Sequence, residues 1–196
     1  MKTRIALFIL ITTFLMAFTN SFPIQKYHIG DTAPSFVTSD VKGNEFNLYK
    51  ELENSKVVLI FYRGVWCPYC NQHVQELTKN IDEIQDAGGK VVLVTPDQPS
   101  FVKDMQKNSS EKITFISDND HKIMDLYDVT FELNEMTSAK WNKQRENVKK
   151  TTGKEDYLLP IPATFVIGKD RVINWVHFVS DYKERSDIND IIKNLK

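Results

Sequence analysis

Two runs of apolar residues flank a segment of helical periodicity and mark the centre of the predicted fold. Residues 56–62 and 90–95 are apolar at nearly every position, which is typical of strands buried on both faces of a sheet. Between them, residues 68–87 carry apolar side chains at helical spacing, and Gly88-Gly89 then favours the end of a helix. The pattern predicts a right-handed βαβ unit with two parallel strands.

The alternation of strands and helices continues along most of the chain, so the predicted fold class is α/β. We expect a small N-terminal hairpin at residues 35–41 and 44–49. Helices are predicted at 100–107 and 121–127, a strand at 113–117, and a C-terminal hairpin at 163–167 and 172–178. A last helix is predicted at residues 186–195, with Ser186 as its N-cap. Residues 129–157 are polar and lysine-rich, and we interpret them as an insertion, partly helical and partly mobile, with Trp141 as its one large apolar anchor.

The N-terminus has the pattern of a secretory signal peptide over residues 1–21. Lys2 and Arg4 precede an apolar stretch at residues 5–18, and small polar residues follow it near a cleavage point. The alternative is an uncleaved membrane anchor, although the stretch is shorter than the ~20 residues that span a bilayer. We therefore expect an exported protein, periplasmic or secreted, with no stable membrane span after cleavage.

The composition of the chain gives no support to nucleic-acid binding or to a metal site. The chain has 25 Lys and Arg against 26 Asp and Glu, a formal net charge of −1, which gives no reason to expect nucleic-acid binding. Residues 28–196 have the length of one domain. A zinc site usually needs four ligands, and two cysteines with four scattered histidines offer no second ligand pair. Asp118 and Asp120 lack the rest of a calcium pattern and are interpreted as solvated turn acids. No metal or cofactor is predicted.

The two cysteines of the chain, Cys67 and Cys70, stand at C-x-x-C spacing where the first predicted strand passes into the helix. Free N–H groups and the positive dipole end at a helix start stabilise a thiolate, and cysteines in such settings have pKa values of about 3.5 to 7.5. Pro68 suits the first helical position because its missing N–H costs no bond there. We expect Cys67 to be the attacking thiolate, with Cys70 beneath it and more buried as the resolving thiol.

Neighbouring residues offer supporting roles, each beside a simpler interpretation. Arg63 can stabilise a thiolate or a peroxide oxygen, or it is a solvated arginine at a strand end. His73 can transfer a proton, or it is a helix-surface histidine. Trp66 and Tyr69 are expected to wall the site and to contact a partner, and Trp66 can equally be a core residue.

A structural disulfide is the alternative to redox chemistry, since exported proteins commonly contain them. A disulfide that closes a loop of only four residues stabilises a protein little, because the gain grows with loop length. The spacing of Cys67 and Cys70 therefore favours a redox role, and a non-enzymatic binding module with an inert disulfide ranks behind it.

Two motifs resemble the thioredoxin fold: Trp66-Cys67-Pro68-Tyr69-Cys70, and Leu159-Pro160-Ile161-Pro162-Ala163 at the entry to a later strand. The resemblance implies a central mixed β-sheet flanked by helices. It also implies a cis bond before Pro162, facing the cysteines, and a backbone hydrogen bond from Ile161 to a disulfide partner.

A closer resemblance is to peroxiredoxin-like members of the alkyl hydroperoxide reductase/thiol-specific antioxidant (AhpC/TSA) family, over residues 28–195. It is carried by the sequence from Tyr62 to Cys70 and by three shorter stretches: Pro96-Asp97, Phe115-Ile116-Ser117-Asp118 and Asp181-Tyr182-x-x-Arg185. It implies thiol or disulfide protein partners, an electron donor and, for a peroxidase, a hydroperoxide substrate.

The peroxidatic signature Pro-x-x-x-Thr-x-x-Cys helps to decide between disulfide exchange and peroxide reduction. Aligned without gaps after Tyr62, it places Arg63 at its Pro, Cys67 at its Thr and Cys70 at the peroxidatic Cys. The buried acid that thioredoxins have six residues before the first cysteine is Phe61 here. We therefore expect thiol–disulfide exchange first, with a thiol-dependent peroxidase as the alternative.

Overall fold

The computed structural model describes residues 24–133 and 139–196. Their centre is a five-stranded sheet in the order β5-β4-β3-β8-β9, in which the β3–β4 and β4–β5 pairs are parallel and the β3–β8 and β8–β9 pairs are antiparallel. The strands are β3 (Lys56–Phe61), β4 (Gly89–Thr95), β5 (Thr114–Ser117), β8 (Ala163–Ile167) and β9 (Ile173–Phe178). The predicted α/β fold with a central mixed sheet is confirmed.

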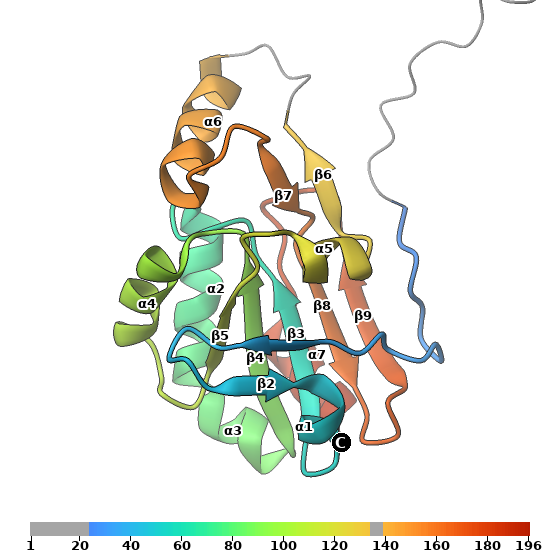
Figure 1. Cartoon of the computed structure of the whole chain (residues 1–196). Helices are drawn as coiled ribbons and strands as arrows, with labels where there is room; N and C mark the ends of the chain where they lie inside the picture. Colours follow the sequence, from blue (N-terminus) through green and yellow to red (C-terminus); the bar gives the residue numbers. More distant parts are fainter. Residues whose placement is uncertain (1–23, 134–138) are drawn as a thin grey trace, which may run out of the picture.

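Both faces of the sheet are covered (Figure 1). One face packs against α2 (Pro68–Lys79), α3 (Ile81–Asp86), α4 (Pro99–Lys107) and α7 (Ile188–Leu195). The other packs against the hairpin of β1 (Val37–Ser39) and β2 (Glu45–Asn47), with α1 (Leu48–Leu52) and α5 (Lys122–Leu126). The central strand is apolar throughout because it lies between these two layers.

Successive residues of the central strand point to opposite layers. Phe61 belongs to the core on the hairpin side, whereas Ile60 and Tyr62 belong to the core on the α2 side, together with both cysteines. Burial of a large apolar side chain contributes about 1.5–3 kcal/mol, so both layers fix the strand firmly. The strand therefore holds the turn that follows it in a fixed position.

The predicted insertion, residues 129–157, contains β6 (Thr130–Glu132) and α6 (Ala139–Thr152), and β7 (Leu158–Pro160), which follows it, pairs antiparallel with β6. Trp141 packs here against Leu133, Val148 and Leu159. The expectation that Trp141 is the one large apolar anchor is wrong, because Phe131 and Tyr157 pack against the same small core. Residues 134–138 lie outside the described ranges.

Several predicted boundaries differ from the structure, and three of them have a local cause. The helix expected over residues 68–87 is two helices, because Asn80 leaves helical geometry and donates its side-chain N–H to the Glu76 carbonyl. The strand expected over 44–49 ends at Asn47, whose side chain caps α1. Ser186 is not the N-cap of the last helix; Asp187 is, accepting from the Asn189 N–H at 2.7 Å.

The predicted signal peptide, residues 1–21, lies outside the described residues. Among the helices of residues 24–133 and 139–196, none has the length and apolar character that crossing a membrane requires.

Candidate active site

The two cysteines lie where β3 passes into α2, as the sequence predicts. Cys67 is the N-cap residue of α2, with extended backbone (φ −87°, ψ 114°), and Pro68 is the first helical residue. Both cysteines are free thiols and both are 1% exposed. The exposed fraction does not distinguish the two thiols, but burial acts more strongly on the pKa of Cys70 than on that of Cys67, so Cys70 is the more deeply buried thiol, as the sequence predicts.

The thiols have opposite protonation preferences. A hydrogen bond from the Cys70 thiol lowers the pKa of Cys67 to about 6, against the opposing effect of burial, and the Cys70 backbone N–H, Arg185 and Arg63 add to the lowering. Burial raises the pKa of Cys70 well above its ordinary value, and its hydrogen bond and charge interaction with Cys67 raise it further. At neutral pH the pair is a Cys67 thiolate beside a Cys70 thiol, which is the polarity that the sequence predicts.

Arg185 is the nearest cation to the thiols. Its Nη2 atom lies 3.0 Å from Cys70 Sγ and 3.8 Å from Cys67 Sγ. No local pattern in the sequence indicates a role for Arg185 in the site, although it closes the Asp181-Tyr182-x-x-Arg185 stretch of the resemblance. That motif was the one signal that could have found it, because Arg185 is 115 residues from Cys70 in the chain.

Arg63 is the second cation, and its side chain is 1% exposed. The solvated interpretation is therefore wrong. Its guanidinium lies 5.3 Å from the ring centroid of Trp66 and 4.8 Å from that of Tyr182, and its Nη2 donates to Gln144 Oε1 of α6 at 2.7 Å. Burial lowers the pKa of Arg63, and the charges of the two cysteines oppose this. An arginine nevertheless stays protonated in proteins, so a fixed positive charge stands beside the thiols.

Aromatic side chains surround this cation and the thiols. Tyr69 is 38% exposed and lies 6.0 Å from Tyr182 between ring centroids, and Tyr182 lies 6.1 Å from Trp141 of α6. Trp66 is half-buried and packs against both the α2-side core and the small core of the insertion. Trp66 and Tyr69 are therefore placed as a wall, which the insertion completes.

His73 does not match either interpretation made from sequence. It is 3% exposed, and its Nε2 lies 3.3 Å from Ser186 Oγ, which is 2.9 Å from Thr164 Oγ1. Burial, with the charge of Arg185, lowers the pKa of His73 to about 4. His73 is therefore a buried neutral residue at pH 7, not a surface histidine and not a group that titrates near working pH.

The implied geometry of Pro162 is also not found. No peptide bond in the described residues is cis, so the Ile161–Pro162 bond is trans. The Ile161 N–H donates to the Val129 carbonyl at 2.7 Å, beside the pairing of β6 with β7. This N–H is therefore occupied within the chain, so a partner contact made through it would have to displace the Val129 carbonyl.

Asp97 and Gly64 shape the turn before Cys67. Asp97 is fully buried, and its Oδ2 accepts from the Val65 N–H at 2.7 Å and from Thr95 Oγ1 at 3.2 Å. Gly64 has φ +148°, and a Cβ there would lie 2.6 Å from Trp66 Nε1 and 3.0 Å from Asp97 Oδ1. Glycine is required at this position by both backbone and space. Asp97 was noted only as part of the resemblance, without a role.

Asp118 is not the solvated acid that we expected. It is 2% exposed and accepts from the N–H groups of Ile123 and Met124 at the start of α5, whereas Asp120 is exposed. Within the described ranges, no three His, Cys, Asp or Glu side chains are grouped to hold a metal ion.

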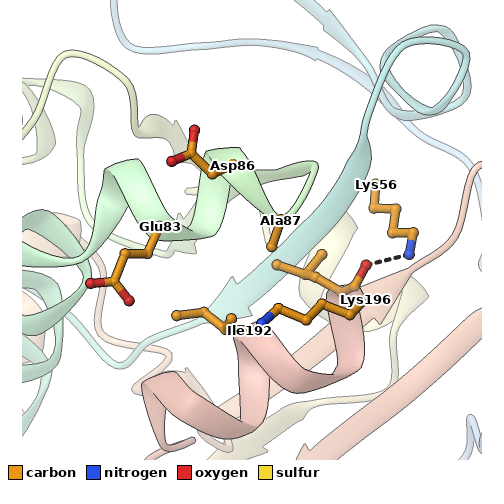
Figure 2. A pocket seen from close by; sticks show the side chains of 7 residues that line it. Lys56, Glu83, Asp86, Ala87, Ile192 and Lys196 are labelled. Carbon is orange, nitrogen blue, oxygen red and sulfur yellow. Dashed lines mark hydrogen bonds between the residues drawn. The ribbon is translucent and has the colours of Figure 1, made fainter.

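A pocket of about 640 Å³ lies away from the thiols, at the end of the sheet where β3 begins. It is lined by Lys56, Glu83, Asp86, Ala87, Ile192, Leu195 and Lys196 (Figure 2). The Lys56 ammonium donates to the Leu195 carbonyl, which ties the end of α7 to the central strand. No cysteine lines the pocket, so it is not part of the redox site.

Substitution of Gly64 by alanine tests the geometry of the turn. We expect Gly64→Ala to lower the free energy of unfolding by about 1–3 kcal/mol more than Gly43→Ala, because its new methyl group overpacks against Trp66 and Asp97. Gly43 also has positive φ but nothing within 4 Å of its added Cβ, so it controls for backbone strain. Urea denaturation measures both, and equal losses would show that the contacts at Gly64 impose no constraint.

The charge environment predicts the pH at which the thiolate forms. The ultraviolet absorbance of the thiolate in the reduced protein should rise through about pH 6, with Cys67→Ser as the blank. In Arg185→Met the midpoint should move up by roughly 1 pH unit, because a cation beside the thiolate is lost. Arg171→Met is the control, since Arg171 stacks on Tyr49. A midpoint equal to that of the control would contradict the role of Arg185.

Comparison with known proteins gives relatives that match parts of the chain. Peroxiredoxin Bcp of Escherichia coli (strain K12) is 29% identical over 100 residues, which cover 51% of this chain and 64% of Bcp. The thiol-disulfide oxidoreductase ResA of Bacillus cereus is 28% identical over 106 residues, covering 54% of this chain and 60% of ResA. The chain thus matches less than two thirds of the length of either relative.

Solved structures share the fold over most of the chain. Peroxidoxin BcpB from Mycobacterium tuberculosis superposes with a TM-score of 0.64 at 20% identity, covering 85% of this chain and 95% of BcpB. A peroxiredoxin-like protein from Aquifex aeolicus gives a TM-score of 0.64 at 19% identity, covering 86% of this chain and 86% of that protein. The model of the AhpC/TSA family matches residues 29–176. Together with the thioredoxin-like sheet and the dithiol turn, this match shows that the chain belongs to the AhpC/TSA family.

Proposed function

We propose that this protein is a thiol–disulfide oxidoreductase that works through Cys67 and Cys70. The observation that carries the proposal is the polarised pair: Cys67 is a thiolate that accepts a hydrogen bond from the Cys70 thiol, and Arg185 Nη2 lies 3.0 Å from Cys70 Sγ. A thiolate is the attacking species in disulfide exchange. An inert disulfide would not need a stabilised anion beside two arginines.

The exchange takes two steps. The Cys67 thiolate attacks one sulfur of a partner disulfide, so that a Cys67–partner bond forms and the other partner sulfur leaves as a thiolate. Cys70 then loses its proton and attacks Cys67 Sγ, which forms the Cys67–Cys70 disulfide and releases the second partner thiolate. Two electrons pass to the partner, and a thiol donor restores the dithiol by the reverse steps.

The buried thiols must become accessible before disulfide exchange can occur. Both cysteines are 1% exposed, so a protein disulfide reaches Cys67 only after the wall of Trp66, Tyr69 and Tyr182 shifts. Tyr69, the exposed member of the wall, is placed to meet the partner first. The name of ResA as a thiol-disulfide oxidoreductase supports the reaction class. With the signal predicted at residues 1–21, we place the reaction outside the cytoplasm.

A second candidate is a thiol-dependent peroxidase. It is favoured by the contact of Arg185 with Cys70, the cysteine that the gap-free alignment places at the peroxidatic position, and by the naming of Bcp as a peroxiredoxin. A thiolate would attack the peroxide and become a sulfenic acid as an alkoxide or hydroxide leaves. The other thiol would then condense with it to a disulfide and release water. The peroxidase ranks behind exchange because Arg63 and Cys67 stand where the peroxidatic signature has Pro and Thr.

The two cysteines should separate the two steps of exchange. We expect Cys70→Ser to accumulate a mixed disulfide with an oxidised protein substrate, because Cys67 attacks but nothing resolves the product. Cys67→Ser should lose nearly all reductase activity, since the attacking thiolate is gone and burial still raises the pKa of the remaining Cys70 thiol. Non-reducing electrophoresis and a disulfide reductase assay measure these outcomes.

The double variant Cys67→Ser/Cys70→Ser provides the control for non-specific trapping. Full activity in Cys67→Ser, or no trapped species in Cys70→Ser, would contradict the mechanism.

Rapid mixing with hydrogen peroxide distinguishes the two candidates. We expect the reduced protein to be oxidised no faster than a free thiol of the same pKa, because the peroxidatic Pro and Thr are replaced by Arg63 and Cys67. Stopped-flow tryptophan fluorescence follows the reaction, with the double cysteine variant as the control. Oxidation well above the rate of the free thiol would place peroxide reduction first.

A further inference from the structure

The second step of the proposed exchange needs a group that accepts the Cys70 proton. The guanidinium groups of Arg63 and Arg185 have no acceptor capacity. His73 is a weak base, because burial and the charge of Arg185 disfavour its protonation, and its Nε2 is engaged with Ser186. Phe61, the position of the missing acid, belongs to the core on the hairpin side of the sheet. The acceptor must therefore come from another element.

Asp97 is the buried carboxyl group behind the redox turn. It follows β4, the parallel neighbour of the central strand, and it is fully buried. Its Oδ2 is held by Val65 and Thr95. Its Oδ1 is buried and makes no hydrogen bond within the described part of the chain, although the Thr151 hydroxyl lies close enough to affect the carboxyl group. A buried carboxylate oxygen in this state has capacity to take a proton.

Tyr62 connects this carboxyl group to the thiols. It packs in the same core as Cys67 and Cys70, and its hydroxyl is buried and makes no hydrogen bond within the described residues. The charges of both Asp97 and Cys70 act on that hydroxyl, and the Thr95 hydroxyl lies beside it. Residue alternation along β4 places Thr95 on the same face as Tyr62. Tyr62 and Thr95 are therefore neighbours on the sheet face that carries the thiols, Thr95 contacts the carboxyl group, and the unpartnered Tyr62 hydroxyl has the capacity to accept a proton.

We propose that Asp97 accepts the proton that leaves Cys70 when it attacks the mixed disulfide, with the hydroxyls of Tyr62 and Thr95 carrying the proton between them. This inference rests on the proposed exchange function. The Cys70 thiol passes its proton to the Tyr62 oxygen, Tyr62 passes one to Thr95, and Thr95 passes one to the Asp97 carboxylate. Cys70 Sγ forms its bond to Cys67 Sγ, the Cys67–partner bond breaks, and the partner sulfur leaves with the electron pair.

The environment of Asp97 suits a proton acceptor. Burial raises its pKa, and the Thr151 hydroxyl, the Val65 N–H and the Thr95 hydroxyl oppose this rise only in part. Tyr62 on β3 is the titratable group that faces it. The groups that face Cys70 are Cys67, Arg185, Arg63 and Tyr62. A carboxylate with a raised pKa is a stronger base than an exposed one, and a positioned base typically contributes about 10²–10⁴-fold to a proton-transfer step.

The Asp97→Asn variant tests this role, because an amide oxygen can still accept from the Val65 N–H while the base is removed. We expect the first step to proceed at nearly the wild-type rate and the second to slow by about 10²-fold or more. The mixed disulfide should therefore accumulate although both cysteines are present. Quenched-flow trapping with acid and non-reducing electrophoresis measures both steps. In the wild type the second step should accelerate with pH as Asp97 ionises, and Asp97→Asn should lose this rise.

Asp118→Asn is the matched control, since Asp118 is also buried and follows the neighbouring strand β5; it should leave the second step unchanged. If Asp97→Asn does not fold, Tyr62→Phe and Thr95→Val carry the test with the same expected accumulation. Wild-type resolution with an unchanged pH profile would overturn the proposal, as would equal slowing of both steps. Failure of the exchange function itself is distinguishable, because Cys70→Ser would then trap nothing.

Discussion

The site depends on the mutual stabilisation of the Cys67 thiolate and two arginines. A buried guanidinium without a nearby anion carries a large desolvation cost, and Arg63 is 1% exposed. The thiolate supplies part of the compensating charge, and the Gln144 oxygen and two aromatic faces supply polar and cation–π contacts. The thiolate in turn owes its low pKa partly to the arginines. Removal of either charge destabilises the other.

This dependence bears on the direction of electron flow. When Cys67 and Cys70 form a disulfide, the negative charge disappears while Arg63 and Arg185 remain. The arrangement therefore stabilises the reduced form relative to the oxidised one, and a stabilised reduced form raises the reduction potential of the pair. On electrostatic grounds the disulfide form is a stronger oxidant than a pair without such cations would be. The chemistry can run in either direction, and the arginines shift it towards accepting electrons.

The sequence predicted those parts of the structure that follow from local patterns. The central strands are continuous apolar runs because both faces are covered, and C-x-x-C spacing before a helical pattern located the thiols. Arg185 and Gln144 were not predicted, because no local pattern shows which distant side chains the fold brings to the turn that carries Cys67. His73 was misjudged because spacing places it one turn after Cys70 but does not show that Ser186 covers it. The trans bond at Pro162 accompanies the hydrogen bond of Ile161 to the insertion, which periodicity did not predict.

Strand alternation explains why the missing acid at position 61 does not remove proton transfer. In this sheet Phe61 lies in the hairpin-side core, on the opposite face from the cysteines, so a carboxyl group there would point away from the thiols unless the strand were displaced. Tyr62, one residue later, lies on the face of the thiols and near Asp97. The polar connection to Cys70 therefore runs through the neighbouring strand β4. The carboxyl group that accepts the proton is best identified by the face of the sheet on which it lies, since a shift of one residue along a strand moves a side chain to the other layer.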